Sequence, residues 1–441
     1  MSMEEKGFFA EKRNKELEKL YVEVQKKRGS DFDEEEFMSH QNRFKDRAKE
    51  HAKRGFFRKI LDRNKEMNDE GFAWEEALRD NREYDKIWNT TLEVIKDSDP
   101  VLKKEMNAEY RESQEMLQTV LDHMKEKKND PDGKGKERKI LVLGLGGGMA
   151  CCYGGGQMAT LVHTGYMDTV DVAVGISGGA CDIGFGLTGE KGVLKGCEIY
   201  YKQCATKKFL DFKRVRRIMN VGFLKDVFNG NEGNENALDV ERVKGSKTEF
   251  FVQATNADTL KPELLDAKKI DDKDGIKGVV RAIYASMALP WFYRQKVEID
   301  GKQYVDGAFE SFPIENIVKR FKESHGITDI LVLPQVPYEK MTGVEKEAKT
   351  ANKIARFLPN KGSLETGSLT LATKMIKSRN NFLRALKYIQ EKNGVHIGIA
   401  YPPDGSVIPI ENDPKTVKAA IFSAAKKMCE QLGEKMDFEL L

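Results

Sequence analysis

Residues 139–180 restrict the fold more than any other stretch of the sequence. They predict a buried strand at 140–143, a glycine loop at 144–148, a helix, and a second buried strand at 170–174. This is the pattern of a βαβ unit, in which the strands lie parallel and the loops that follow them meet at the carboxyl edge of the sheet. The second strand leads into Gly175-Ile176-Ser177-Gly178-Gly179, a G-x-S-x-G sequence. The sequence therefore predicts an α/β fold in which a glycine loop faces a serine.

A glycine loop that faces such a serine suits acyl transfer. A serine on a sharp turn between strand and helix is exposed as a nucleophile, and backbone N–H groups about 3 Å from the developing oxyanion stabilise it. Each feature alone has an ordinary explanation, because glycine loops are common tight turns and G-x-S-x-G often arises by chance. Their occurrence at the ends of successive strands is much more specific. Ser177 is therefore the candidate nucleophile.

The glycines do not match a nucleotide-binding motif. A dinucleotide fingerprint G-x-G-x-x-G that begins at Gly144 or Gly146 would need glycine where Met149 or Cys151 stands. Residues 184–190 lack the lysine of a phosphate-binding loop. Nucleotide binding is therefore the least favoured alternative.

Residues that could complete a triad with Ser177 follow it in the sequence. Asp306 directly follows a predicted β-hairpin at 297–305, in which Asp300-Gly301 is the turn signal. His325 and His396 lie further along, so the chain order formally permits a Ser–Asp–His triad. We interpret His325 as part of the turn that ends a helix, and His396 as a packed structural histidine on a strand.

The chain divides into three parts by composition and pattern. Residues 1–135 are rich in charge and show apolar positions at helical spacing, so we expect a charged helical N-terminal region. Residues 136–341 carry the strands and the motifs and form the predicted catalytic domain. Residues 342–441 are expected to form a helical extension with one strand that packs on this domain.

Composition excludes several classes of function. The net charge of +3 over 441 residues gives no reason to expect a nucleic-acid partner. The six cysteines lack zinc-ligand spacing and are expected to be reduced thiols of a cytoplasmic protein. We expect no signal peptide and no membrane span. Basic and apolar residues alternate at 51–61 and cluster at 207–217, which permits peripheral contact with a membrane, although packing on the protein itself or a solvated face is the simpler interpretation.

Five motifs in chain order resemble those of the patatin-like phospholipase family, which shares a Ser–Asp dyad architecture with cytosolic phospholipase A2. The resemblance covers residues from about 140 to 337, and the tail at 379–381 and 400–405 resembles a bacterial patatin-like subgroup. Residues 1–138 lie outside it. The motifs are Gly146-Gly147-Gly148-Met149, the G-x-S-x-G around Ser177, Ala254-Thr255-Asn256, the segment from Ala285 to Pro290, and Asp306-Gly307-Ala308.

The resemblance implies a fold and a mechanism. The fold would be a three-layer α/β sandwich with a mostly parallel central sheet. Ser177 would be the nucleophile, Asp306 the general base, and the N–H groups of Gly146, Gly147 and Gly148 the oxyanion hole. The protein would then be a serine acyl hydrolase of the phospholipase A or lysophospholipase type, with a phospholipid or lysophospholipid as substrate and neither metal nor cofactor.

One position departs from the family pattern. The family usually has Arg-Gly after G-G-G-x, where this chain has Ala150-Cys151. In some relatives that arginine helps to hold the loop or a phosphate. Two alternatives therefore remain: a non-catalytic scaffold that binds a membrane or a partner, and a transacylase with the same dyad. The sequence identifies neither substrate-binding residues nor an oligomeric state.

Overall fold

The computed structural model describes most of the chain from residue 100 onward. The described residues are 100–211, 214, 219–231, 235–259, 261–289, 295–308, 314–338, 386–403, 407 and 411–437. Most of the predicted N-terminal helical region, including 51–61, and a large part of the predicted extension lie outside them. Met106–Met341 and Asn380–Leu441 form one compact unit, whereas Met1–Glu105 and Thr342–Arg379 are assigned to another. The predicted boundaries at 135 and 341 stay predictions.

A mixed eight-stranded sheet forms the centre of the larger unit. The strands follow the order β5-β6-β3-β2-β1-β7-β8, and β4 pairs with β3 outside this path. The parallel strands are β1 (Ile140–Gly144), β2 (Val170–Ile176), β3 (Glu249–Asn256), β7 (Asp329–Leu333) and β8 (His396–Ile399); the antiparallel ones are β4 (Pro262–Asp266), β5 (Val297–Ile299) and β6 (Lys302–Val305). The predicted α/β fold with a mostly parallel sheet is confirmed.

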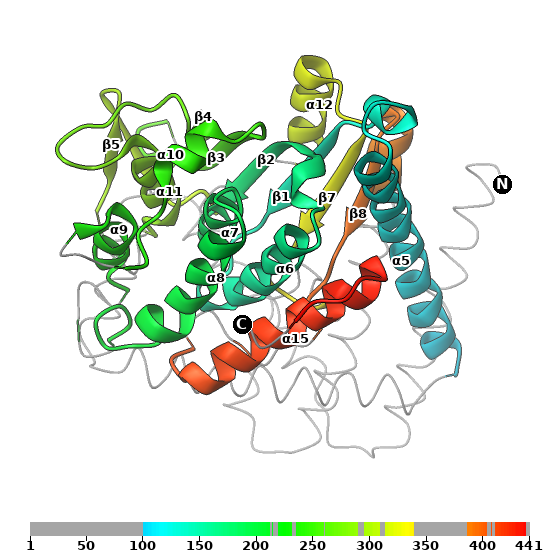
Figure 1. Ribbon diagram of the computed structural model, residues 1–441, viewed down its shortest axis with the longest axis horizontal. Coiled ribbons are helices and arrows are strands. Elements are labelled where there is room, and N and C mark those ends of the chain that lie inside the picture. The colour runs from blue at the N-terminus through cyan, green and yellow to red at the C-terminus, as the bar shows by residue number, and fades with distance from the viewer. Residues whose placement is uncertain are drawn as a thin grey trace, which may run out of the picture. The chain divides into compact units, whose positions relative to one another are not determined.

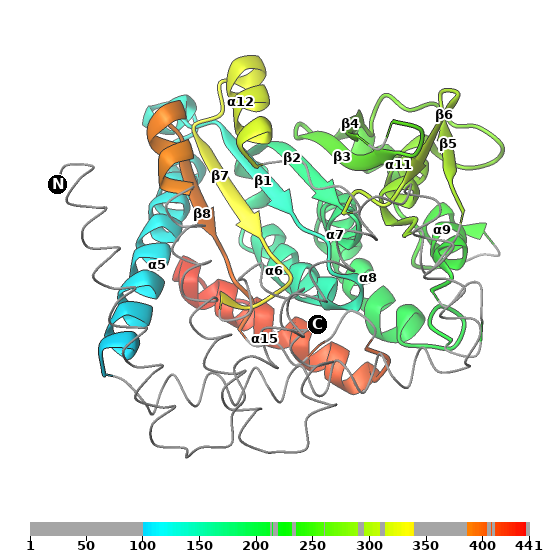
Figure 2. The same ribbon diagram turned by 180° about the vertical axis from the view of Figure 1, so that it is seen from behind.

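Helices cover both faces of this sheet. Figure 1 shows α6, α7, α8 and α15 in front of the sheet, and Figure 2 shows the opposite face with α12. The helices are α5 (Pro100–Asn129), α6 (Cys152–His163), α7 (Gly178–Gly186), α8 (Glu190–Glu198), α9 (Val221–Asn229), α10 (Val240–Gly245), α11 (Gly278–Met287), α12 (Ile314–His325) and α15 (Pro414–Leu432), together with short 3₁₀ turns at Lys134–Glu137, Gly148–Cys151 and Met167–Thr169 and a π-helix at Ile199–Cys204.

The core explains why the central strands are apolar throughout. Every residue of β1 and of β7 is buried, because a parallel strand between two helical layers has no solvent-facing side. On one face, Leu141 and Val172 pack in a single cluster with Phe321 of α12 and Leu386. The helical layers therefore hold the central strands in place, and the loops that follow these strands lie at the edges of the sheet.

Two local sequence signals explain elements of the fold, and the first is the predicted hairpin. β5 and β6 pair as an antiparallel hairpin whose turn residues Asp300 and Gly301 have φ values of 51° and 76°. In α15, Asp413 caps the helix by accepting from the N–H of Thr416 at 3.0 Å, and Gly433 ends it in the left-handed conformation. The hairpin matters for function because Asp306 directly follows it.

Candidate active site

Ser177 lies on the turn between β2 and α7. Its φ of 53° and ψ of −127° are strained values for a residue with a side chain. Glycine is required around it: a Cβ on Gly175 would lie 2.4 Å from Ala180 Cα, and one on Gly179 would lie 2.5 Å from the carbonyl carbon of Gly144. The G-x-S-x-G sequence is thus explained by close packing of α7 against the carboxyl end of β1.

Asp306 contacts Ser177 directly. The Ser177 hydroxyl donates to Asp306 Oδ2 at 2.8 Å, and the N–H of Ala308 donates to Asp306 Oδ1 at 2.7 Å. The aspartate is 2% exposed. Burial raises the pKa of Asp306 to about 7, against the opposing effect of the Ala308 N–H and the Ser177 hydroxyl. A carboxyl with such a pKa is suited to exchange protons near neutral pH.

The motif segments around 254–256 and 285–290 hold this pair in place. Thr255 donates its hydroxyl to the backbone carbonyl of Asp306 at 3.0 Å. Ser286 accepts the backbone N–H of Ser177 at 2.7 Å and donates to the carbonyl of Gln253 at 2.5 Å. Ser286 therefore connects the serine turn to β3, and Thr255 connects the aspartate to the same strand.

The glycine loop lies against Ser177. A Cβ on Gly146 would lie 2.8 Å from Ser177 Cβ, so only glycine permits this approach. Gly148 has a φ of 58°, which also favours glycine. Within the described ranges, no hydrogen bond uses the N–H groups of Gly146, Gly147 or Gly148, and all three residues line the same cavity as Ser177. The predicted oxyanion residues are thus adjacent to the predicted nucleophile.

Gln335 supports the glycine loop, and sequence reasoning missed it. Its side chain is 3% exposed and accepts the N–H of Gly154 at 3.0 Å, in the first turn of α6. The cap residue of α6, Cys151, makes no side-chain capping bond, so Gln335 supplies the cap from another element. A Cβ on Gly147 would lie 2.6 Å from Gln335 Cβ. A signal was available, because Gln335 follows β7 at the same carboxyl edge.

Cys151, which follows Ala150 where the family usually has Arg-Gly, corresponds to the glycine of that pair. It is completely buried, and a Cβ on Gly178 would lie 2.4 Å from its sulfur. Burial raises the pKa of the Cys151 thiol well above its usual value, and the nearby Asp182 raises it further, so the group is neutral. This region therefore packs the loop against the serine turn and offers no charge to a phosphate.

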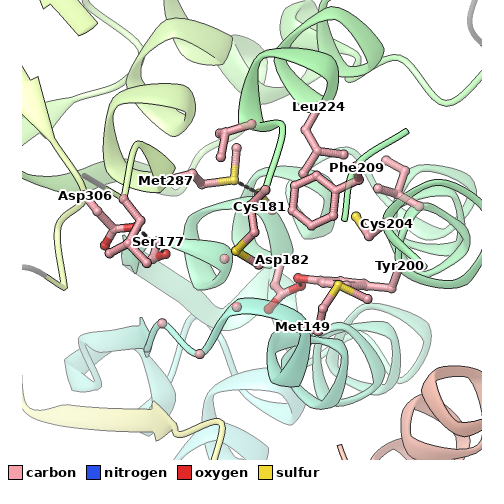
Figure 3. A pocket seen from close by; sticks show the side chains of 18 of the residues that line it. Met149, Ser177, Cys181, Asp182, Tyr200, Cys204, Phe209, Leu224, Met287 and Asp306 are labelled. Carbon is pink, nitrogen blue, oxygen red and sulfur yellow. Dashed lines mark hydrogen bonds between the residues drawn. The ribbon is translucent and has the colours of Figure 1, made fainter. Parts of the chain in front are cut away.

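An apolar cavity of about 280 Å³ opens beside the pair. In Figure 3, Ser177 and Asp306 lie at one end of the view and Phe209 and Leu224 at the other. One polar pair interrupts the wall: Tyr200, on the π-helix, donates its hydroxyl to Asp182 at 2.8 Å. Burial raises the pKa of Asp182 well above its usual value, although the Tyr200 hydroxyl opposes this. The cavity thus presents a neutral, mostly apolar surface.

The histidines are engaged elsewhere. His325 Nε2 lies 3.1 Å from Glu249, and His163 Nδ1 lies 2.6 Å from Glu190. His396 begins β8, at the opposite edge of the sheet from Ser177, and its side chain is 47% exposed. The interpretation of His396 as a packed residue is wrong, because the ring lies where the strand begins and not inside the layers. The structure brings Asp306, and none of these histidines, to Ser177.

Comparison with known proteins finds a family similarity over the part of the chain that holds Ser177 and Asp306. The family model described as patatin-like phospholipase matches residues 141–317. Among solved structures, VipD from Legionella pneumophila matches with a TM-score of 0.36 and 12% identity over 67% of each chain. Among the curated proteins, none matches the sequence. Residues 141–317 are therefore similar to patatin-like phospholipases, whereas the resemblance of the tail to a bacterial subgroup stays a prediction.

Proposed function

We propose that the protein is a serine acyl hydrolase that cleaves carboxylic esters of phospholipids or lysophospholipids. The observation that carries this proposal is the 2.8 Å hydrogen bond from Ser177 Oγ to the buried Asp306, beside an apolar cavity. A nucleophile with its base at hydrogen-bond distance is the arrangement that covalent catalysis by serine requires.

The proposed reaction has two steps. Asp306 takes the hydroxyl proton as Ser177 Oγ attacks the ester carbonyl, and the oxyanion of the tetrahedral intermediate accepts hydrogen bonds from the loop at Gly146–Gly148. Each such donor typically contributes about 3 kcal/mol to transition-state stability. The C–O bond then breaks, and the leaving alcohol takes the proton from Asp306. In the second step, Asp306 takes a proton from water, which attacks the acyl-enzyme and releases the acid. Asp306 then returns the proton to Ser177 Oγ.

The cavity supports a lipid as substrate. Its walls include Phe185, Phe228 and Met287, which suit a hydrocarbon chain and give no partner for a charged group. Because Ala150 stands where relatives have an arginine, we infer that the acyl chain contributes more to binding than the headgroup. Because phospholipids are held in bilayers, we expect the protein to contact a bilayer from its surface.

The cytoplasm is the proposed compartment. The six cysteines are all buried thiols outside any disulfide, which suits a reducing environment. Within the part of the chain that the structure describes, we find no helix with the length and hydrophobicity that crossing a bilayer requires.

Labelling with a fluorophosphonate, followed by turnover of a panel of phospholipids and lysophospholipids, tests the proposal. Ser177→Ala should abolish both labelling and turnover, whereas Ser324→Ala, at an exposed helical serine, should change neither. Persistent labelling of Ser177→Ala would contradict the proposal. Absence of turnover on every lipid would instead support the scaffold, and transfer of the acyl group to a lipid alcohol would identify a transacylase.

A further inference from the structure

Three potential metal ligands meet at the amino edge of the sheet, opposite Ser177. Asp329 begins β7 and His396 begins β8, where the two residues are paired in register, and His123 projects from α5. His123 Nδ1 lies 2.6 Å from Asp329 Oδ1, and His396 Nδ1 lies 3.2 Å from the same oxygen. One ligand atom from each residue lies within 4.8 Å of the other two. Three separate elements thus direct nitrogen and oxygen ligands at one point.

The surroundings of Asp329 are unusual for a buried carboxylate. Its side chain is 0% exposed, and burial of an anion is costly unless a cation or good hydrogen bonds compensate. The nearby lysines, Lys127 and Lys139, pair with Asp171 at 2.5 and 3.5 Å instead. Among the described residues, the side chains that face the Asp329 carboxylate are the two imidazoles and the hydroxyl of Thr328. A divalent cation at this point would compensate the charge directly.

We propose that His123, Asp329 and His396 bind a divalent transition-metal ion, with Zn²⁺ as the best match. Two imidazoles and one carboxylate form a ligand set that Zn²⁺ accepts, with water in the fourth position, and imidazole disfavours Mg²⁺ and Ca²⁺. The side chains of His123 and His396 are 18% and 47% exposed, so solvent reaches the site to supply that water.

The two separations of the imidazoles from the carboxylate lie close to the value that an ion requires. Tetrahedral bonds of about 2.1 Å place neighbouring ligand atoms about 3.4 Å apart. The separation of His396 Nδ1 from Asp329 Oδ1, 3.2 Å, nearly meets this value, and the 2.6 Å separation at His123 must lengthen by less than about 1 Å.

The remaining oxygen of the carboxylate is already held. The Thr328 hydroxyl donates to Asp329 Oδ2 at 2.6 Å, which leaves Oδ1 to face the imidazoles. Ligating carboxylates in metal sites are commonly oriented by such a hydrogen bond from a neighbouring group. The bound ion would hold α5 against the starts of β7 and β8, so its effect is expected on stability.

The test is zinc binding by the full chain after treatment with a chelator. Calorimetry with Zn²⁺ should give one site per chain, elemental analysis should find one equivalent after dialysis, and zinc should raise Tm. Thr328→Val, which removes a hydrogen bond to a ligand, should weaken zinc binding by about 10- to 100-fold. His396→Ala, which removes a ligand itself, should weaken it by more than roughly 100-fold.

Two histidines paired with glutamate provide the matched control. His163→Ala and His325→Ala remove imidazoles that contact Glu190 and Glu249, and they should leave zinc binding unchanged. Because His396 is half exposed, its replacement should still permit folding, which the near-ultraviolet dichroism checks. Failure of the wild type to bind zinc, or equal binding by His396→Ala, would show a hydrogen-bonded cluster only and overturn the proposal.

Discussion

Asp306 and Asp329 are both buried carboxylates, and they lie at opposite edges of one sheet. Asp306, at the carboxyl edge, receives hydrogen bonds from a hydroxyl and a backbone N–H. Asp329, at the amino edge, faces two imidazoles and a threonine hydroxyl. Burial raises the pKa of Asp306, the two neutral donors oppose this only in part, and the carboxylate is directed at Ser177. Asp329 instead faces two imidazoles, which are potential ligands for the same cation. The identity of the neighbours, more than burial itself, separates a proposed base from a proposed metal ligand.

The largest expected effect comes from removal of the proposed base. Asp306→Asn keeps the shape of the side chain but cannot accept the proton of Ser177, so kcat should fall by about 10²–10⁴-fold. Asp258→Asn, at an exposed aspartate, is the matched control and should retain full activity. Ester turnover by both variants measures the difference. Full activity of Asp306→Asn would remove the contrast between the two carboxylates.

A smaller loss is expected when the support of the glycine loop is removed. Gln335→Ala deletes the acceptor for Gly154 and the packing against Gly147, so the oxyanion donors should shift. Misplacement of about 1 Å costs up to about 10²-fold in rate. We expect kcat to fall with little change in KM, and the rate of fluorophosphonate labelling to fall in parallel. Gln118→Ala, at an exposed position of α5, should change neither quantity. A rise in KM alone would contradict the role of Gln335 in holding the glycine loop.

The pH dependence of activity should report the raised pKa of Asp306. Only the carboxylate accepts a proton, so kcat/KM should rise with a midpoint near the pKa of about 7 and fall about tenfold per pH unit below it. A pH profile of kcat/KM measures this midpoint. A midpoint near 4, the usual value for aspartate, would mean that the carboxyl is hydrated and that burial does not tune it.

The same pKa shift predicts the sign of a stability effect. Because the folded-state pKa of Asp306 is raised, its contribution to stability is full below about pH 4 and is lost as the pH rises through about 7. Asp306→Asn stays neutral throughout, so its Tm relative to wild type should rise between about pH 4 and pH 7 and stay level above that range. Thermal unfolding at several pH values tests this, and a constant difference would contradict it.

The sequence predicts the carboxyl edge better than the amino edge, for a physical reason. Loops after parallel strands meet at one edge whatever the order of the strands, so Ser177 and the glycine loop could be placed together. The roles of Thr255 and Ser286 required the structure, although their segments stood out as motifs. The cluster of His123, Asp329 and His396 depends on β7 and β8 being neighbours, with α5 beside them.

Distance along the chain explains what was missed. His123 and Asp329 are 206 positions apart, and Gln335 is 181 positions from Gly154, so neither contact leaves a local spacing that a motif search recognises. Asp182 and Tyr200 are closer in sequence, but Tyr200 lies on a π-helix. Apolar periodicity does not predict a π-helix, so the sequence pattern does not indicate this contact.

The smallest expected effect concerns the amino edge without metal. In zinc-free protein, His396→Ala removes one contact of a half-exposed imidazole, while His123 and Thr328 still contact Asp329, so the free energy of unfolding should change little. With zinc in excess, the wild type should gain stability in proportion to the logarithm of the zinc concentration, and the variant should not. Urea unfolding with and without zinc measures both differences. Equal stabilisation of the two proteins would assign the zinc effect to another site and leave Asp329 as a hydrogen-bonded carboxylate. The two edges of the sheet would then differ only in the groups that donate hydrogen bonds to Asp306 and Asp329.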